Sequence, residues 1–154
     1  MDAWRWVLPQ PTNSTELAEV SASKQVYPSP IKQIQATYVV GGNWTWIRIG
    51  AEPIPTADGT GRLEGNYGVV YRIGVQLRNP FAEPKKVEVA FDAGAGPANA
   101  VFLIGGQYVD MVGAYAGGER NVAQFQLSPN ETRNVTIETM PLGGSFYPAA
   151  LVVR

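Results

Sequence analysis

Hydrophobic and polar residues alternate along two runs in the middle of the chain. In residues 69–78 every second side chain is apolar: Val69, Tyr71, Ile73, Val75 and Leu77. Residues 86–92 repeat the pattern with Val87, Val89 and Phe91. A period of two is that of a strand with one buried and one exposed face. Pro80 and Pro84 between the runs lack the amide donor that a sheet needs. The pattern therefore predicts an antiparallel hairpin with a long loop.

The same alternation recurs along most of the chain. Residues 31–40 and 43–49 flank Gly41-Gly42, which is typical of a two-residue hairpin turn. Residues 101–104 and 107–112 flank Gly105-Gly106 and predict a second tight hairpin. Further strands are expected at 122–127, 134–139 and 147–153, and Pro148 places the last of these at an edge or near its own start. About eight or nine strands, spaced by roughly ten residues, predict an all-β fold, an antiparallel β-sandwich with an N-terminal extension.

The first thirty residues differ from the rest and divide the chain in two. Residues 1–30 hold Trp4 and Trp6 and then a short Ser-rich stretch, 15–24, that predicts a helix capped by Asn13 or Ser14. This segment is expected to be an arm or linker, either a contact to another domain or subunit or a plain tail. Residues 31–154 are expected to form a single domain, which is long enough to bury a core.

Composition narrows the range of functions. The 154 residues contain no Cys and no His, and their net charge is −1. Disulfides, thiol nucleophiles, imidazole metal sites and Ser-His-Asp triads are therefore excluded. Without a basic block the chain lacks the surface that binds nucleic acid, and no apolar run approaches the roughly 20 residues of a membrane span.

Carboxylates are the remaining candidates for catalysis. A glycosidase would need two acids facing each other across roughly 5–9 Å, and the sequence does not pair any of Asp58, Glu64, Asp92, Asp110, Glu119 and Glu138. We therefore expect no catalytic residue, no cofactor and no metal. The long loop at 51–68 carries Asp58-Gly59-Thr60-Gly61 and Glu64, which weakly resembles a calcium loop. It lacks the acidic spacing of an EF-hand, and a plain glycine-rich loop is the preferred interpretation.

Four Asn-X-Ser/Thr sequons bear on location. They begin at Asn13, Asn43, Asn130 and Asn134, and they favour an extracellular or cell-envelope setting. The alternative is that Thr is simply a good strand residue and Asn a good turn residue. The opening residues do not resemble a signal peptide, so we expect either a cytoplasmic protein or a chain whose leader has been removed, and the sequons favour the second.

One strand carries candidate ligand-binding residues. Trp44, Trp46 and Arg48 lie two apart, and hence on one face of the strand, while Tyr108 belongs to a later strand. Planar aromatic rings on a sheet face can stack on sugar rings, and Arg48 can add hydrogen bonds. The alternative is that the tryptophans belong to the core, or that Trp4 and Trp6 cover them.

A resemblance to a known class supports the fold. The run Phe125-Gln-Leu127-Ser-Pro129-Asn-Glu131-Thr-Arg-Asn-Val135-Thr-Ile137 resembles a motif of immunoglobulin-like and fibronectin-III-like domains, in which a strand ends in Leu-X-Pro-Gly-Glu and a Val-X-Val strand follows. Asn130 stands at the usual glycine and tolerates the left-handed conformation. The resemblance covers residues 66–154 and implies a secreted or envelope β-sandwich without implying an activity.

The sequence thus predicts a non-catalytic module for protein interaction or structural assembly. Free edge strands can pair with another chain, so a protein partner or self-association is expected. The alternative is a carbohydrate-binding module that uses Trp44 and Trp46, with a polysaccharide as the partner.

Overall fold

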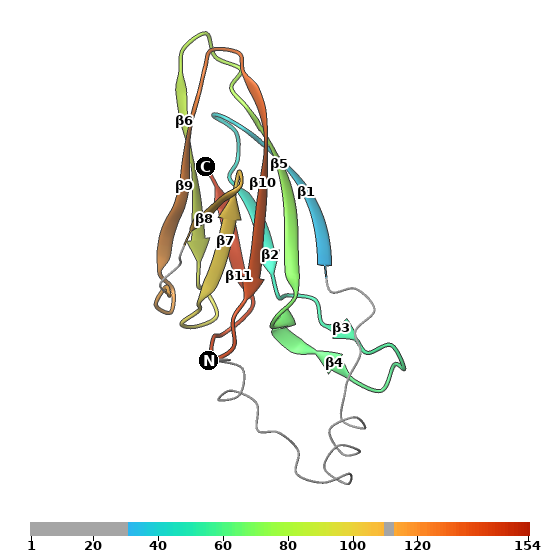
Figure 1. Cartoon of the computed structure of the whole chain (residues 1–154). Coiled ribbons are helices and arrows are strands. Elements are labelled where there is room, and N and C mark those ends of the chain that lie inside the picture. Colours follow the sequence, from blue (N-terminus) through green and yellow to red (C-terminus); the bar gives the residue numbers. More distant parts are fainter. Residues whose placement is uncertain (1–30, 110–112) are drawn as a thin grey trace, which may run out of the picture.

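The structure, a computed structural model, describes residues 31–109 and 113–154, and within them it is a two-layer β-sandwich (Figure 1). Sheet A has five strands in the order β1-β5-β10-β7-β8, and sheet B has four in the order β2-β11-β6-β9. A small third sheet pairs β3 with β4. The predicted arm at 1–30, with its helix and its tryptophans, lies outside the described residues, as does Asp110.

The strands follow the predicted alternation closely. Their bounds are β1 Ile31–Val39, β2 Thr45–Ile49, β3 Ile54–Pro55, β4 Arg62–Leu63, β5 Val70–Arg78, β6 Lys85–Asp92, β7 Ala100–Ile104, β8 Gln107–Val109, β9 Glu119–Leu127, β10 Thr132–Pro141 and β11 Ala149–Val153, with one 3-10 turn, η1, at Glu64–Asn66. Every apolar residue predicted to face inward on β5 and β6 is buried. The described part of the chain thus has eleven strands, more than the eight or nine expected, because β3 and β4 are too short to show a period.

Side chains from both sheets meet in one core between the layers. Phe91 of β6 and Phe102 of β7 pack edge to face, with ring centroids 5.5 Å apart. Ile73, Ile137 and Leu151 are fully buried beside them. The burial of these side chains, with that of the alternating positions around them, holds the two layers together.

Two predicted hairpins are wrong, because each joins different sheets. Strands β1 and β2 turn at Gly41, as expected, but β1 pairs with β5 in sheet A while β2 pairs with β11 in sheet B. Likewise β5 and β6 lie in opposite sheets. A turn signal fixes where a strand ends and does not fix which sheet receives the next strand. The third predicted hairpin is confirmed, since β7 pairs with β8.

The predicted β-sandwich is confirmed, and its strands pair antiparallel except in one place. Strand β1 pairs with β5 in parallel, from Ile31 opposite Val70 to Val39 opposite Arg78. Parallel strands need a long connection, and the segment from β2 to η1 supplies it. The sequence predicts that Pro148 places β11 either at the edge of a sheet or close to the start of the strand. The strand begins after Pro148 and lies inside sheet B, between β2 and β6.

The connection that crosses from β9 to β10 has the predicted conformation. Asn130 has φ +56°, the left-handed region that the motif requires. Glu131 closes the turn by accepting a hydrogen bond from the Ser128 amide, and its own amide donates to the Ser128 carbonyl. The conformation of Asn130 and the hydrogen bonds of Glu131 thus explain why the motif has these residues at the turn.

Candidate functional site

The outer face of sheet B carries the predicted tryptophans. Ile47 and Ile49 of β2 point into the core, opposite Leu151 and Ala149 of β11. The alternate residues, Trp46 and Arg48, therefore point outward, and Trp44 precedes the strand on the same side. We call Trp44, Trp46, Arg48 and the adjacent Arg154 the tryptophan face.

Both tryptophans are open to solvent. Trp44 is 52 % and Trp46 is 53 % exposed, although each is a large aromatic side chain. Of the alternatives open at the sequence level, placement in the core is excluded. Because β2 is the outermost strand of sheet B, the two rings stand at the rim of the sandwich. Exposed aromatics gathered in one place are typical of binding surfaces.

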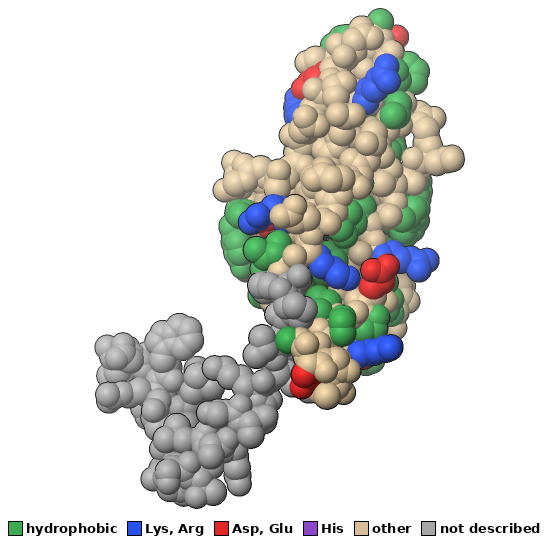
Figure 2. Space-filling model, turned by 90° about the vertical axis from the view of Figure 1, so that its right-hand side faces the viewer, with side chains coloured by type: hydrophobic (Ala, Val, Ile, Leu, Met, Phe, Trp, Pro, Cys, Tyr) green, Lys and Arg blue, Asp and Glu red, His purple; other side chains and the backbone are tan. Residues whose placement is uncertain are grey.

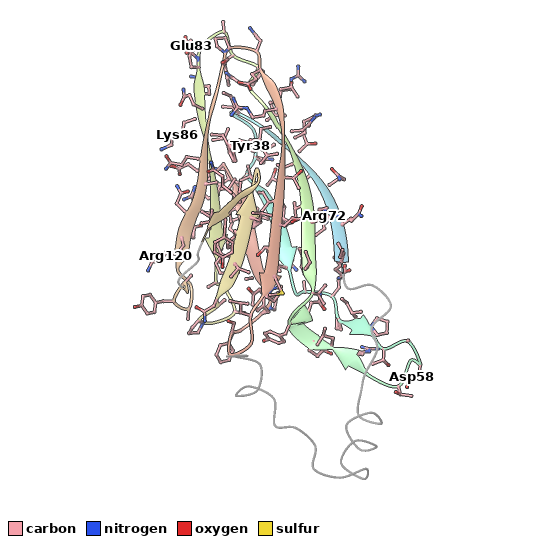
Figure 3. The ribbon with its side chains drawn as sticks, viewed as in Figure 1. Tyr38, Asp58, Arg72, Glu83, Lys86 and Arg120 are labelled. Atoms are coloured by element: carbon pink, nitrogen blue, oxygen red, sulfur yellow. The ribbon has the colours of Figure 1, made fainter. Side chains whose placement is uncertain are left out.

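A charged network borders the tryptophan face. The Arg154 guanidinium stacks on Trp44, 5.0 Å from the ring centroid. Arg154 also forms ion pairs with Glu119, at 2.8 Å, and with Glu88, at 3.7 Å. Lys86, which Figure 3 labels on β6, approaches Glu88 to 2.8 Å. A hydrogen bond from Lys86 is the main cause that lowers the pKa of Glu88, and Arg154 lowers it further. This side of the face is therefore charged and internally neutralised.

Arg48 differs from these cations. Among the described residues no carboxylate comes within ion-pair distance of its guanidinium, and its register neighbour is Ala150. Arg48 lines a cleft of about 500 Å³ at the rim between the sheets, together with Tyr71 and with Lys32 and Glu52, which pair with each other at 3.8 Å. The tryptophan face therefore offers one cation that is available to a partner.

Tyr108 does not belong to this site. It lies on β8, the last strand of sheet A, and is 66 % exposed. The tryptophan face adjoins the other rim, where Thr45 of β2 donates a hydrogen bond to the Thr37 carbonyl of β1. The structure thus brings Trp44, Trp46 and Arg48 together and separates Tyr108 from them by the width of sheet A.

Sequence reasoning missed Arg154, Glu88 and Glu119 as neighbours of the tryptophans. Arg154 reaches this face because its backbone continues β11 and exchanges two hydrogen bonds with Glu88 of β6. The signal was the period of two along β11, which puts residues 150, 152 and 154 on the side of the strand opposite Leu151 and Val153, although Val152 is itself buried. It becomes usable only when β11 is known to lie between β2 and β6.

The long loop is partly ordered by its own short strands. Asp58 lies at the tip of the β3–β4 pair, far from the main sheets (Figure 3). Its carboxylate accepts hydrogen bonds from Thr56 Oγ1 at 2.6 Å, Thr60 N at 3.0 Å and Thr60 Oγ1 at 2.8 Å. These hydrogen bonds lower the pKa of Asp58 to about 2, and the bond from Thr56 has the largest effect. Within the described residues no group of three or more acidic, His or Cys side chains gathers to hold a metal.

Two of the other candidate acids lie on opposite faces. Glu138 of β10 pairs with Arg72 of β5 at 2.6 Å on the outer side of sheet A. Glu119 pairs with Arg154 on the outer side of sheet B. Each of these two carboxylates therefore pairs with an arginine, and the two lie on opposite sides of the sandwich.

Three sequons can be placed on the structure. Asn43, Asn130 and Asn134 are all exposed, in the β1–β2 turn, the β9–β10 turn and β10 respectively. Asn13 lies outside the described residues. No helix in the described ranges is long and apolar enough to cross a membrane.

Comparison with known proteins adds little to this geometry. No family model matches the chain, and no curated protein matches it. Among solved structures the chain is similar to a pre-peptidase C-terminal domain of a collagenase from Bacillus anthracis, with 11 % sequence identity and a TM-score of 0.36. The match covers 82 % of this chain and 97 % of that domain. A likeness this weak supports no statement about function.

Proposed function

We propose that this protein is a non-catalytic β-sandwich module that assembles with a second copy of itself through the tryptophan face. The observation that carries the proposal is the pair of half-exposed rings, Trp44 and Trp46, on the outer side of an edge strand. Trp and Arg are the residues most enriched at the energetic centres of protein interfaces, and Arg48 stands next in the same row.

The unpaired side of β2 is suited to this role. Among the described strands, β2 pairs only with β11, and no strand pairs with the backbone of its other side, where the Thr45 side chain donates a hydrogen bond to the Thr37 carbonyl of β1. The strand reads Thr-Trp-Ile-Arg-Ile, with one charged residue and no Pro or Lys, the residues most often used to blunt an exposed edge. A second extended strand can therefore continue the sheet.

The order of side chains on β2 is self-complementary. When two copies of β2 run antiparallel and are centred on Trp46, Trp46 lies beside the partner's Trp46, and Trp44 lies beside the partner's Arg48. Cross-strand aromatic pairs contribute roughly 0.5–1.5 kcal/mol, and exposed cation–π pairs about 0.5–1 kcal/mol. A two-fold interface forms each Trp–Arg contact twice, which predicts a weak dimer that depends on concentration.

Three finer statements accompany this proposal. The absence of His and Cys from the sequence and the pairing of Glu138 and Glu119 with arginines on opposite faces support a role without catalysis. The exposed sequons support an extracellular or cell-envelope location. The turn that follows Leu127, with Asn130 in the left-handed conformation, supports kinship with immunoglobulin-like domains.

Sedimentation velocity on the full chain tests the assembly. The wild type is expected to shift from monomer to dimer as its concentration rises through the micromolar range. Trp46→Ala and Arg48→Glu should weaken the dimer about tenfold or more, since each removes a contact that the symmetry repeats. Tyr115→Ala is the matched control, because Tyr115 is an even more exposed ring, at 79 %, on a loop away from β2.

Two results would overturn the proposal. One is a chain that stays monomeric at every concentration, and the other is a dimer that Trp46→Ala leaves unchanged. A monomer whose tryptophan fluorescence responds to a soluble polysaccharide, and loses the response in Trp46→Ala, would assign the tryptophan face to carbohydrate instead.

A further inference from the structure

The outer face of sheet A holds a depression that the tryptophan face does not explain. It has a volume of about 470 Å³ and lies over β1, β5 and β10. The β1 side of the molecule faces the viewer in Figure 2, where uncharged polar side chains and backbone cover most of the upper part. We call this depression the amide groove and define it by Gln35, Gln76 and Asn134, with Gly74 as its floor.

Gly74 makes room on this face for the Gln35 side chain. It sits in the middle of β5, opposite Gln35 of β1 and Thr136 of β10. Glycine weakens a strand interior and commonly marks a place where another group approaches closely. A Cβ at Gly74 would come within 2.9 Å of Gln35 Nε2, so the Gln35 amide lies where a side chain of residue 74 would stand.

The register sets two parallel rows of polar groups around this floor. Gln35, Gly74 and Thr136 form the first row, and Thr37, Gln76 and Asn134 form the second. Every residue of the two rows is exposed except Gly74, which is half-buried. In the described part of the chain, the three amides make no side-chain hydrogen bond to another residue, so both their donors and their acceptors remain available.

The groove is uncharged. Of the two rows beside it, one holds Arg72, labelled in Figure 3, which pairs with Glu138 at 2.6 Å, and the other holds Arg78, outside the lining. The amides both donate and accept hydrogen bonds, and they lie among hydroxyl groups without net charge. These groups match a ligand that is rich in neutral hydroxyl groups. A phosphate or sulfate would need cations that the lining lacks.

An aromatic ring lies further along the same face. Leu103 of β7 pairs with Glu138 on one side and with Tyr108 of β8 on the other, which places Tyr108 on the outer side of sheet A. From β5 to β8 there are three strand spacings, or about 14 Å. The ring can stack on a sugar ring at one end while the amides bind hydroxyls at the other.

We propose that the amide groove binds a neutral oligosaccharide that lies across the strands of sheet A, with Tyr108 at one end. This site is distinct from the tryptophan face and does not depend on assembly. Asn134 also begins a sequon, and a glycan attached there would fill the same groove. The test therefore uses full chain produced in a bacterial host without N-glycosylation.

Isothermal titration with a panel of soluble, neutral glucan, mannan, xylan and chitin fragments tests the proposal. At least one class is expected to bind, and the double variant Gln76→Ala/Asn134→Ala should weaken it about tenfold or more, which corresponds to about 1.4 kcal/mol. Tyr108→Ala should weaken the longer fragments more than the shorter ones. Side-chain amide signals of Gln35, Gln76 and Asn134 should shift on binding in NMR spectra.

The controls separate this site from the tryptophan face. Asn121→Ala/Gln126→Ala removes the same two amide types from exposed positions on β9 of sheet B and should leave binding unchanged, as should Trp46→Ala. No binding by any member of the panel would overturn the proposal. So would binding that survives the Gln76/Asn134 variant.

Discussion

Asp58 shows how single side chains set local properties in this fold. Three donors from Thr56 and Thr60 converge on its carboxylate at the tip of β3 and β4. Hydrogen bonds to the charged form of an acid lower its pKa. The loop that composition marked as featureless thus contains a small, specific turn, which the Thr-Ala-Asp-Gly-Thr sequence encodes through an aspartate and its two flanking threonines.

The pH dependence of the turn follows from the lowered pKa. The pKa of Asp58 falls from the ordinary value of 3.8 to about 2 in the folded chain. Its contribution to stability is therefore fully present above pH 4 and is lost as the pH falls towards 2. An NMR titration of the Asp58 carboxyl carbon should show this midpoint, and Thr56→Val should move the midpoint upward. A midpoint near 3.8 in the unmodified chain would contradict the turn.

At the scale of elements, the alternation predicted the strands well and their partners poorly. The inward faces of β5 and β6 are those expected from the sequence, because burial selects apolar residues at every second position. The sheet that a strand joins depends on the connection before it. The β5–β6 loop contains proline at 80 and 84, and the same prolines fit a wide hairpin or a crossing between layers.

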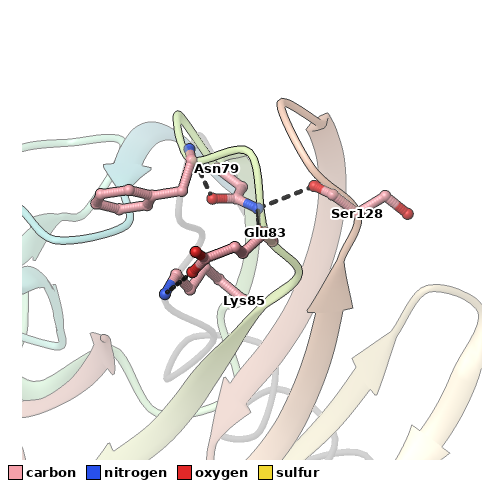
Figure 4. A network of polar contacts seen from close by, with 5 residues as sticks. Asn79, Glu83, Lys85 and Ser128 are labelled. Atoms are coloured by element: carbon pink, nitrogen blue, oxygen red, sulfur yellow. Dashed lines mark hydrogen bonds and ion pairs between the residues drawn. The ribbon is translucent and has the colours of Figure 1, made fainter.

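Asn79 connects the β5–β6 crossing to a neighbouring turn. Its side chain is fully buried, with Nδ2 donating to the Glu83 carbonyl at 2.7 Å and to the Ser128 carbonyl at 2.9 Å (Figure 4). Its Oδ1 accepts from the Phe81 amide at 3.1 Å. One side chain thus fastens the β5–β6 connection to the β9–β10 turn at the same end of the sandwich.

Removing this amide should destabilise the whole domain. Asn79→Ala leaves two carbonyls and one amide without their partner, and the free energy of unfolding should fall by about 2–3 kcal/mol. Urea denaturation followed by circular dichroism measures the change. Asn121→Ala, at an exposed position on β9, is the control and should change stability by less than about 0.5 kcal/mol. Equal, small effects for both variants would show that Asn79 does not fasten the connection.

At the scale of the whole molecule, the two outer faces differ in chemistry. Sheet B presents tryptophans and arginines at its β2 rim, and sheet A presents amides and hydroxyls over Gly74. The sequence placed Trp44, Trp46 and Arg48 together because they share one strand. It placed Tyr108 on a later strand, and only the strand order shows that β8 and β2 belong to opposite rims. The amide groove was not predicted, because its residues come from three strands that are far apart in the chain.

Assembly through β2 is the central claim, and hydrogen–deuterium exchange measured at several protein concentrations tests it most directly. The β2 amides on the unpaired side of the strand should exchange quickly in dilute protein and become protected as the concentration rises, because they gain carbonyl partners from the second copy. Trp46→Ala should abolish that change and leave the exchange of the sheet A strands as it was. Protection of β2 that is the same at every concentration would contradict the account.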